Sequence, residues 1–169
     1  MRSSIEHIID HLNRAEVRYI VVGGVAVVLH GHLRVTADLD LVVELEQENA
    51  QKAIRVLKDL GWRPRAPVSA ESFTDVEKRR LWAKEKGMTV FSFWHPEVAT
   101  LEVDLFVREP FDFGAVYARA VMVELEDIEV RVIGLDDLIA LKKQAGRHQD
   151  LADIEALQIL SELSEEENP

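Results

Sequence analysis

The chain has 169 residues, of which 47% are hydrophobic and 30% charged, and its formal net charge is −11. This length suffices for one well-buried core, so we expect a single domain over residues 1–163, followed by an acidic flexible tail at 164–169. The acidic balance argues against broad binding of duplex DNA, which needs clustered Lys and Arg. The lack of cysteine excludes disulfides and thiolate metal sites.

The hydrophobic runs are of strand length. No segment has the pattern of a secretory signal or of a membrane span. We therefore expect a cytoplasmic protein that does not interact with membranes.

The first third of the chain alternates between helical and strand patterns. Ser4 is a candidate N-cap for the first helix, and Gly61 is placed to end the last helix of this part in the left-handed conformation. The predicted elements are a helix ending at residue 14, a strand at 18–22, a Gly23-Gly24 turn, a short helix at 25–29, a strand at 38–44 and a helix at 46–60.

The remainder begins with a proline-broken loop at 63–67 and ends in helices. We expect helices at 74–86, 112–119, 135–145 and 150–163, and strands at 89–94, 100–107, 121–125 and 129–133. The turn at 95–97 predicts an antiparallel pair. The order of elements predicts an α/β or α+β fold, in which helices, including the C-terminal ones, cover a mixed β-sheet.

Basic residues gather between Arg63 and Lys86, where seven Lys and Arg side chains face only four acids. Such a stretch is most simply a solvated helix face with opposite charges in register. The alternative is a lid over an anionic substrate. We also expect this stretch and the C-terminal helices to form the pocket that selects the acceptor.

Asp38 and Asp40 are the most informative residues of the chain. Because alternate strand residues share a face, both carboxylates project from the same face of the strand, while Leu39 points into the core. Two residues of strand separate them by about 6.6 Å, which suits a pair of divalent cations.

A third carboxylate on a neighbouring strand would complete such a site. In the strand at 100–107, Glu102 and Asp104 point to the same face, and we favour Asp104 as the ligand. An Asp-x-Asp pair or a Gly-Gly turn alone is common on ordinary strands and turns, whereas their order and the third aspartate favour a functional site.

These residues together resemble the nucleotidyltransferase superfamily to which DNA polymerase beta belongs. The chain is similar to small bacterial members of the abortive-infection toxin and lincosamide-modifying types. The closest matches are residues 31–40 (GHLRVTADLD) and 141–154 (LKKQAGRHQDLADI), and the resemblance covers roughly 15–160. Many active members have Gly-Ser where this chain has Gly23-Gly24, so a hydroxyl donor is missing.

The resemblance implies a fold, an activity and a set of site residues. Asp38, Asp40 and Asp104 are then catalytic and hold two Mg²⁺ ions, with Mn²⁺ as an alternative. The implied nucleotide-binding residues are Gly23, Gly24, Arg34, Thr36, Lys142 and Arg147. For Arg147 the structural alternative is a pair with Asp150 or Asp153 that fixes the turn between two helices; for Arg34 and Thr36 it is simple loop solvation.

Three functions stay open from the sequence. The first is metal-dependent transfer of an NMP from an NTP to a hydroxyl of a protein, an RNA or a small molecule, within a toxin-antitoxin or phage-defence pair. The second is a catalytically silent module that binds nucleotide or neutralises a cognate toxin or antitoxin. The third is a structural partner whose acidic surface docks a basic chain.

Overall fold

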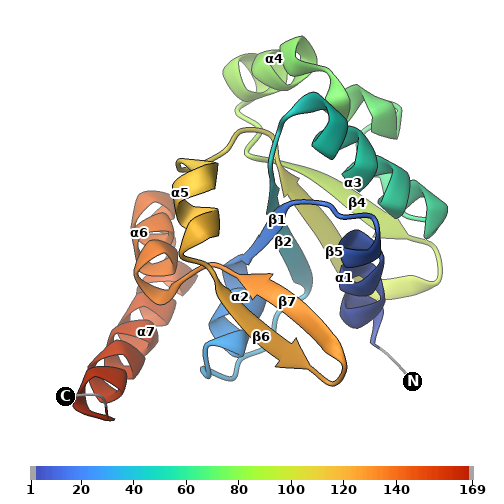
Figure 1. Ribbon diagram of the computed structural model, residues 1–169. Helices are drawn as coiled ribbons and strands as arrows, with labels where there is room; N and C mark the ends of the chain where they lie inside the picture. Colours follow the sequence, from blue (N-terminus) through green and yellow to red (C-terminus); the bar gives the residue numbers. More distant parts are fainter. Residues whose placement is uncertain (1–2, 168–169) are drawn as a thin grey trace.

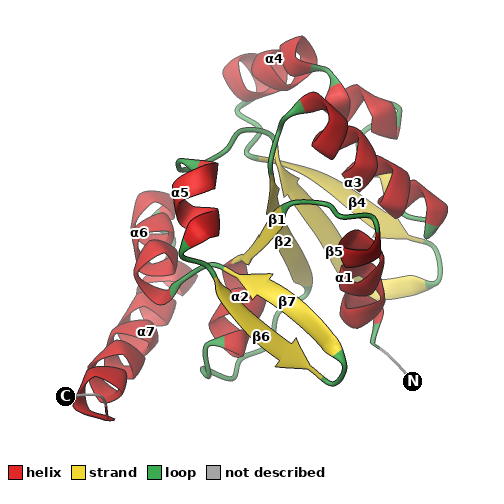
Figure 2. Ribbon diagram, in the orientation of Figure 1, coloured by secondary structure: helices red, strands yellow, loops and turns green. Residues whose placement is uncertain are grey.

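A seven-stranded mixed sheet with helices packed against it forms the body of the protein (Figures 1 and 2). The computed structural model describes residues 3–167. The strand order across the sheet is β3-β4-β5-β2-β1-β7-β6. The elements are α1 (Ser4–Arg14), β1 (Tyr19–Val22), α2 (Gly23–Leu29), β2 (Asp38–Val43), α3 (Gln47–Asp59), β3 (Arg63–Pro64), the 3₁₀ helix η1 (Ala70–Thr74), α4 (Val76–Lys86), β4 (Val90–His95), β5 (Val98–Phe106), α5 (Phe113–Ala118), β6 (Val121–Leu125), β7 (Ile128–Val132), α6 (Leu135–Ala145) and α7 (His148–Glu167).

The sheet is mixed because two of its strand pairs are parallel. β2 runs parallel to β5 and β1 parallel to β7, while the other four neighbouring pairs are antiparallel. The predicted antiparallel pair around the turn at 95–97 is confirmed by β4 and β5. The predicted fold class, a mixed sheet covered by helices, is therefore correct.

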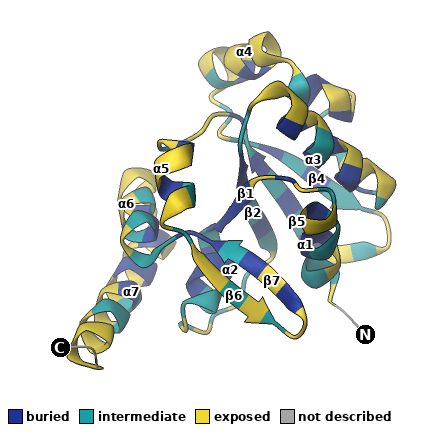
Figure 3. Ribbon diagram, in the orientation of Figure 1, coloured by how far each residue is buried: buried dark blue, intermediate teal, exposed yellow. Residues whose placement is uncertain are grey.

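The core lies on the central strands, where all four residues of β1 are buried (Figure 3). Helices α1 and α3 contact each other, and α3 also contacts β2. Helix α2 contacts β1, β2 and α6, and α6 packs along α7. The C-terminal helices are thus connected through α2 to the ends of the two central strands.

Helix ends follow local sequence signals. The Ser3 hydroxyl accepts from the Glu6 amide while the Glu6 carboxylate accepts from the Ser3 amide, so the N-cap of α1 is Ser3 rather than the expected Ser4. Gly87 and Gly146 have φ values of 59° and 65° and end α4 and α6. Glycine adopts this left-handed conformation without strain, and both helices stop where expected.

The segment after α3 is not wholly a loop, contrary to the expectation for 63–67. Arg63 and Pro64 form the short edge strand β3, paired with Trp94 and Phe93 of β4. An edge strand tolerates proline because the missing N–H can face away from the sheet.

Helix α7 is longer than the 150–163 expected from the sequence. It begins at His148 and continues to Glu167, and its last residues are exposed (Figure 3). Residues 164–167, expected to be a flexible tail, are therefore helical, which agrees with the good intrinsic helix propensity of glutamate. Residues 168 and 169 lie outside the described part. Within residues 3–167, no helix combines the length and apolar character needed to cross a membrane.

Candidate active site

The parallel pairing of β2 with β5 brings the three predicted carboxylates to one face of the sheet. In the register of the two strands, Asp40 lies opposite Asp104 and Asp38 opposite Glu102. Leu39 and Leu41, which alternate with the aspartates, are fully buried on the other face. Asp104 is thus the direct neighbour of Asp40, whereas Glu102 forms an ion pair with Arg65.

Burial and neighbouring carboxylates raise the proton affinity of Asp40 and Asp104. Burial, followed by the charges of Asp104 and Asp38, raises the pKa of Asp40 from 3.8 to about 7. Burial also raises the pKa of Asp104, against a hydrogen bond from the Ser92 hydroxyl. Within residues 3–167 none of the three aspartates forms an ion pair. The site therefore concentrates negative charge that no side-chain partner neutralises.

The two glycines explain how the backbone fits around these side chains. Gly23 has φ +67°, and a Cβ there would collide with the Asp40 carboxylate. A Cβ on Gly24 would lie 2.5 Å from Thr36 Oγ1 and 2.8 Å from Arg34 Nη2. A serine at 24 would meet the same two groups, so the position where related sequences carry a hydroxyl is here approached by the hydroxyl of Thr36. Gly23 is the first residue of α2, whose N-terminus has no side-chain cap.

The donor set suits a hard divalent cation, although the three carboxylates do not converge on one point. In the described part of the chain, no group of three or more His, Cys, Asp or Glu side chains forms a ready-made metal site. Asp104 Oδ1, however, is buried with no hydrogen-bond partner. A buried, unpartnered carboxylate oxygen beside two further uncompensated carboxylates is what an oxygen-ligated cation such as Mg²⁺ or Mn²⁺ would satisfy.

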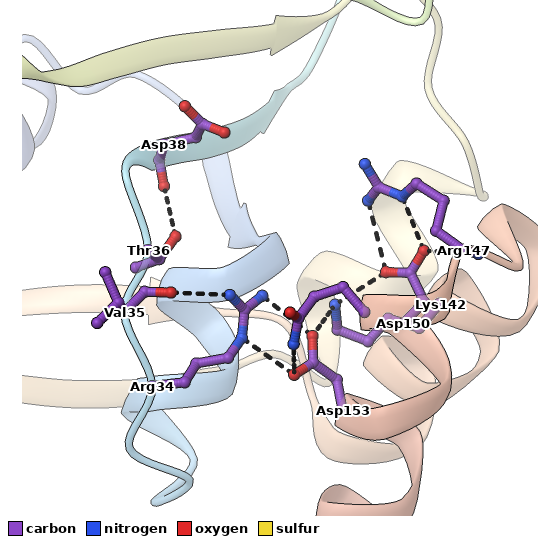
Figure 4. A network of polar contacts seen from close by, with 9 residues as sticks. Arg34, Val35, Thr36, Asp38, Lys142, Arg147, Asp150 and Asp153 are labelled. Atoms are coloured by element: carbon purple, nitrogen blue, oxygen red, sulfur yellow. Dashed lines mark hydrogen bonds and ion pairs between the residues drawn. The ribbon is translucent and has the colours of Figure 1, made fainter.

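A network of charged side chains connects the loop before β2 to the C-terminal helices (Figure 4). Lys142 is buried, and its Nζ lies 3.3 Å from Asp150 Oδ1 and 3.0 Å from Asp153 Oδ2. Arg34 Nη2 donates to the same oxygen, Asp153 Oδ2, at 3.0 Å. Arg34 thereby connects the loop before β2 to α7.

Arg147 pairs with Asp150, as the structural alternative proposed. Its Nε lies 2.8 Å from Asp150 Oδ2, and the same oxygen accepts from the Arg147 amide at 3.1 Å. Although burial opposes the charged form, these hydrogen bonds lower the pKa of Asp150. The Arg147 side chain remains largely exposed, so its position leaves it access to a ligand.

One cavity of about 980 Å³ contains all nine predicted site residues in its lining. They come from the start of α2, the loop before β2, β2 itself, β5, α6 and the turn between α6 and α7. Cavities of this size accommodate nucleotides and cofactors. The nine residues are Gly23, Gly24, Arg34, Thr36, Asp38, Asp40, Asp104, Lys142 and Arg147.

The basic stretch between Arg63 and Lys86 does not reach this cavity. None of its residues lines it, and α4 lies at the opposite end of the molecule from α7 (Figure 1). The lining therefore does not support the expectation that this stretch covers the main site. The C-terminal helices do line the cavity, as expected.

Sequence reasoning missed several residues that belong to the site. Asp150 and Asp153 were considered only as partners of Arg147, although their burial marks them as anchors of Lys142 and Arg34. Their spacing of three on one helix was the available signal. Ser92 and Arg108 carried no signal, because their positions depend on the pairing of β4 with β5 and on the loop that follows.

The comparison with protein families decides the classification. The family described as "Nucleotidyltransferase of unknown function (DUF6036)" matches residues 1–167. The chain belongs to this nucleotidyltransferase family. The family and the fold identify it as a transferase. Among curated proteins, no sequence matches the chain.

Several solved nucleotidyltransferase structures share the fold. The lincosamide antibiotic adenylyltransferase LnuA, solved with lincomycin, superposes with a TM-score of 0.60 at 17% identity, over 94% of this chain and 98% of that one. ANT(2'')-Ia in complex with adenylyl-2''-tobramycin gives 0.54 at 14% identity, over 98% and 97%. A putative nucleotidyltransferase from Thermotoga maritima gives 0.53 at 15%, over 96% and 91%. At these identities the likeness establishes the fold.

Proposed function

We propose that this nucleotidyltransferase moves a nucleoside monophosphate from an NTP to an acceptor hydroxyl with the help of divalent metal. The observation that supports this most directly is the pairing of Asp40 with Asp104 beside Gly23, with one buried Asp104 oxygen left without a partner. Ordinary strand surfaces do not leave buried carboxylates uncompensated, because the desolvation cost is high.

In the proposed reaction, the acceptor hydroxyl oxygen attacks the α-phosphorus of the NTP. A new P–O bond forms, the bond between the α-phosphorus and the bridging oxygen to the β-phosphorus breaks, and pyrophosphate leaves. The hydroxyl proton is transferred to the Asp104 carboxylate, which lies beside Asp40 on the neighbouring strand. Little covalent work is asked of the protein beyond positioning.

The metal site would be formed by Asp38, Asp40 and Asp104. Two Mg²⁺ ions held there, or Mn²⁺ in their place, would neutralise the charge that develops on the phosphates. Asp40 binds such a cation best when deprotonated, so with its pKa near 7 binding releases a proton around neutral pH.

The NTP phosphates are proposed to bind where the start of α2 and the loop before β2 line the cavity. The backbone N–H groups of Gly23 and Gly24 and the Thr36 hydroxyl lie together at the start of α2 and are proposed to donate to phosphate oxygens. Arg34, held by Asp153, adds a positive charge beside them. Lys142 and Arg147 act from the C-terminal helices, where both also exert an attraction on Asp40.

The acceptor is not assigned by these residues. Structural neighbours were solved with lincomycin and with adenylyl-2''-tobramycin, so a small molecule is one acceptor class to test beside proteins and RNA ends. A co-transcribed small partner gene would favour the toxin-antitoxin setting. The alternative is a silent module that keeps the nucleotide site for sensing or for neutralising a partner.

The test is incubation of the protein with α-³²P-labelled NTPs and Mg²⁺, followed by a search for label on proteins, RNA and small hydroxyl compounds. Transfer that is lost in Asp104→Asn and kept in Asp59→Asn, an exposed position outside the cavity, supports the proposal. Calorimetric binding of Mg-ATP without transfer to any acceptor supports the silent module. If the protein neither binds Mg-ATP nor transfers label, both the transferase and the silent module are contradicted.

A further inference from the structure

A second cavity, of about 490 Å³, lies against α4, and we call it the α4 pocket. Half of its lining residues are apolar and half are cationic, and none carries a carboxylate. In a chain with 31 acidic and 20 basic residues, such a lining departs sharply from the average surface. The lining residues are Leu45, Val76, Arg79, Arg80, Ala83, Lys84, Val107 and Arg108.

Arg79 is the buried cation of this pocket, with only 5% of its surface exposed. Its Nη1 donates to the Phe73 carbonyl, and its guanidinium lies over the Phe73 ring, 5.4 Å from the centroid. Within residues 3–167 it forms no ion pair, and Asp75 and Glu109 act on it only at longer range. A buried charge without a paired counter-ion is costly, and a bound anion would offset that cost.

The other cations are also open to a ligand. Lys84 and Arg108 form no ion pair with any described residue. Arg80 pairs at 3.1 Å with Glu77 one turn earlier, but both side chains are more than two-thirds exposed. Exposed pairs of this kind are weak and are readily exchanged for a better partner.

Arg108 lines both cavities, so the α4 pocket adjoins the candidate active site. Its volume suits a small molecule, and the net charge of −11 opposes a polyanion such as RNA. We propose that the α4 pocket binds a small molecule with an acidic group and an apolar body, and that this molecule is the acceptor. The acceptor role rests on the proposed function, whereas binding in the α4 pocket does not.

Binding can be measured with octyl phosphate as the probe, titrated calorimetrically into the full chain at low ionic strength and below its micelle concentration. We expect saturable one-to-one binding, weakened at least tenfold in the double variant Arg80→Gln, Lys84→Gln. The matched control is Lys78→Gln, Lys86→Gln, which removes the same charge from exposed positions of the same helix outside the pocket and should stay within twofold. Octan-1-ol, which lacks the anion, should bind at least tenfold more weakly.

If both double variants lose the same affinity for octyl phosphate, the attraction is unspecific and the proposed α4 pocket is overturned. The proposal is also overturned if octyl phosphate does not bind to a protein that still binds Mg-ATP. The acceptor role is tested separately, with any acceptor found by the labelled-NTP search. Octyl phosphate should inhibit transfer competitively with that acceptor and not with NTP. Inhibition of any other kind, or none, overturns the acceptor role. If no acceptor is labelled, the proposed function fails, whereas the calorimetric result on the pocket remains valid.

Discussion

Replacing Asp40 by asparagine should stabilise the metal-free protein at high pH. The pKa of Asp40 is raised from 3.8 to about 7 by burial and by the neighbouring carboxylates. Between these two pH values the unfolded chain has lost the proton and the folded chain has kept it. The free energy of unfolding therefore falls as pH rises through this window. Asparagine removes this titration.

The size follows from about 1.36 kcal/mol per pH unit for one proton. From pH 5 to the pKa near 7, the wild type should lose roughly 3 kcal/mol relative to Asp40→Asn. Comparing the two proteins at pH 5 and again at pH 8 cancels any effect of the substitution that does not depend on pH.

The assay is urea unfolding at both pH values with EDTA present, analysed by linear extrapolation. Asp59→Asn, an exposed substitution, should follow the wild type at both pH values. Adding Mg²⁺ at pH 8 should restore stability to the wild type more than to Asp40→Asn. A difference between wild type and Asp40→Asn that is the same at pH 5 and pH 8 would refute the account of the Asp40 environment.

Three further predictions concern the carboxylates, the glycine bend and the charged network. Asp104→Asn should lower nucleotidyl transfer at least 1000-fold in the labelled-NTP assay, while Glu102→Gln, two residues earlier on the same face of β5, should keep it within tenfold. Gly24→Ala should destabilise by about 1–3 kcal/mol in urea unfolding, because its Cβ meets Thr36, and adding Thr36→Ala should recover part of the loss; full additivity of the two changes would contradict this contact. Asp153→Ala should cost about 3–5 kcal/mol, because it leaves Lys142 buried with one carboxylate fewer; a loss below 1 kcal/mol would show that the network contributes little.

Local sequence signals determined most of the secondary structure. Helix ends at Gly87 and Gly146 and the alternation of Asp38, Leu39 and Asp40 depend on backbone conformation and on strand geometry, which act over a few residues. The same alternation predicted that Asp38 and Asp40 share a face and pointed to Asp104 on a neighbouring strand, which pairs with Asp40.

Pairing between distant segments was decided only by the tertiary structure. Counting back from the pair His95–Val98 would place Ser92 opposite Leu101, but an irregularity between Phe93 and His95 shifts the register, so that Ser92 lies opposite Asp104. Edge pairing likewise made a strand of Arg63 and Pro64, a segment that reads as a loop in isolation.

The placement of charged residues far apart in the chain was also beyond the sequence. The sequence pattern allowed the basic stretch that includes α4 to cover the active site, whereas in the structure α4 lines a separate pocket. Packing also brings Asp150 and Asp153 of α7 to Lys142 and Arg34. The sequence determines on which face of a strand or helix each side chain lies, because the periodicity of these elements is local. Only the folded chain determines which faces meet, because that depends on the burial of the whole core at once.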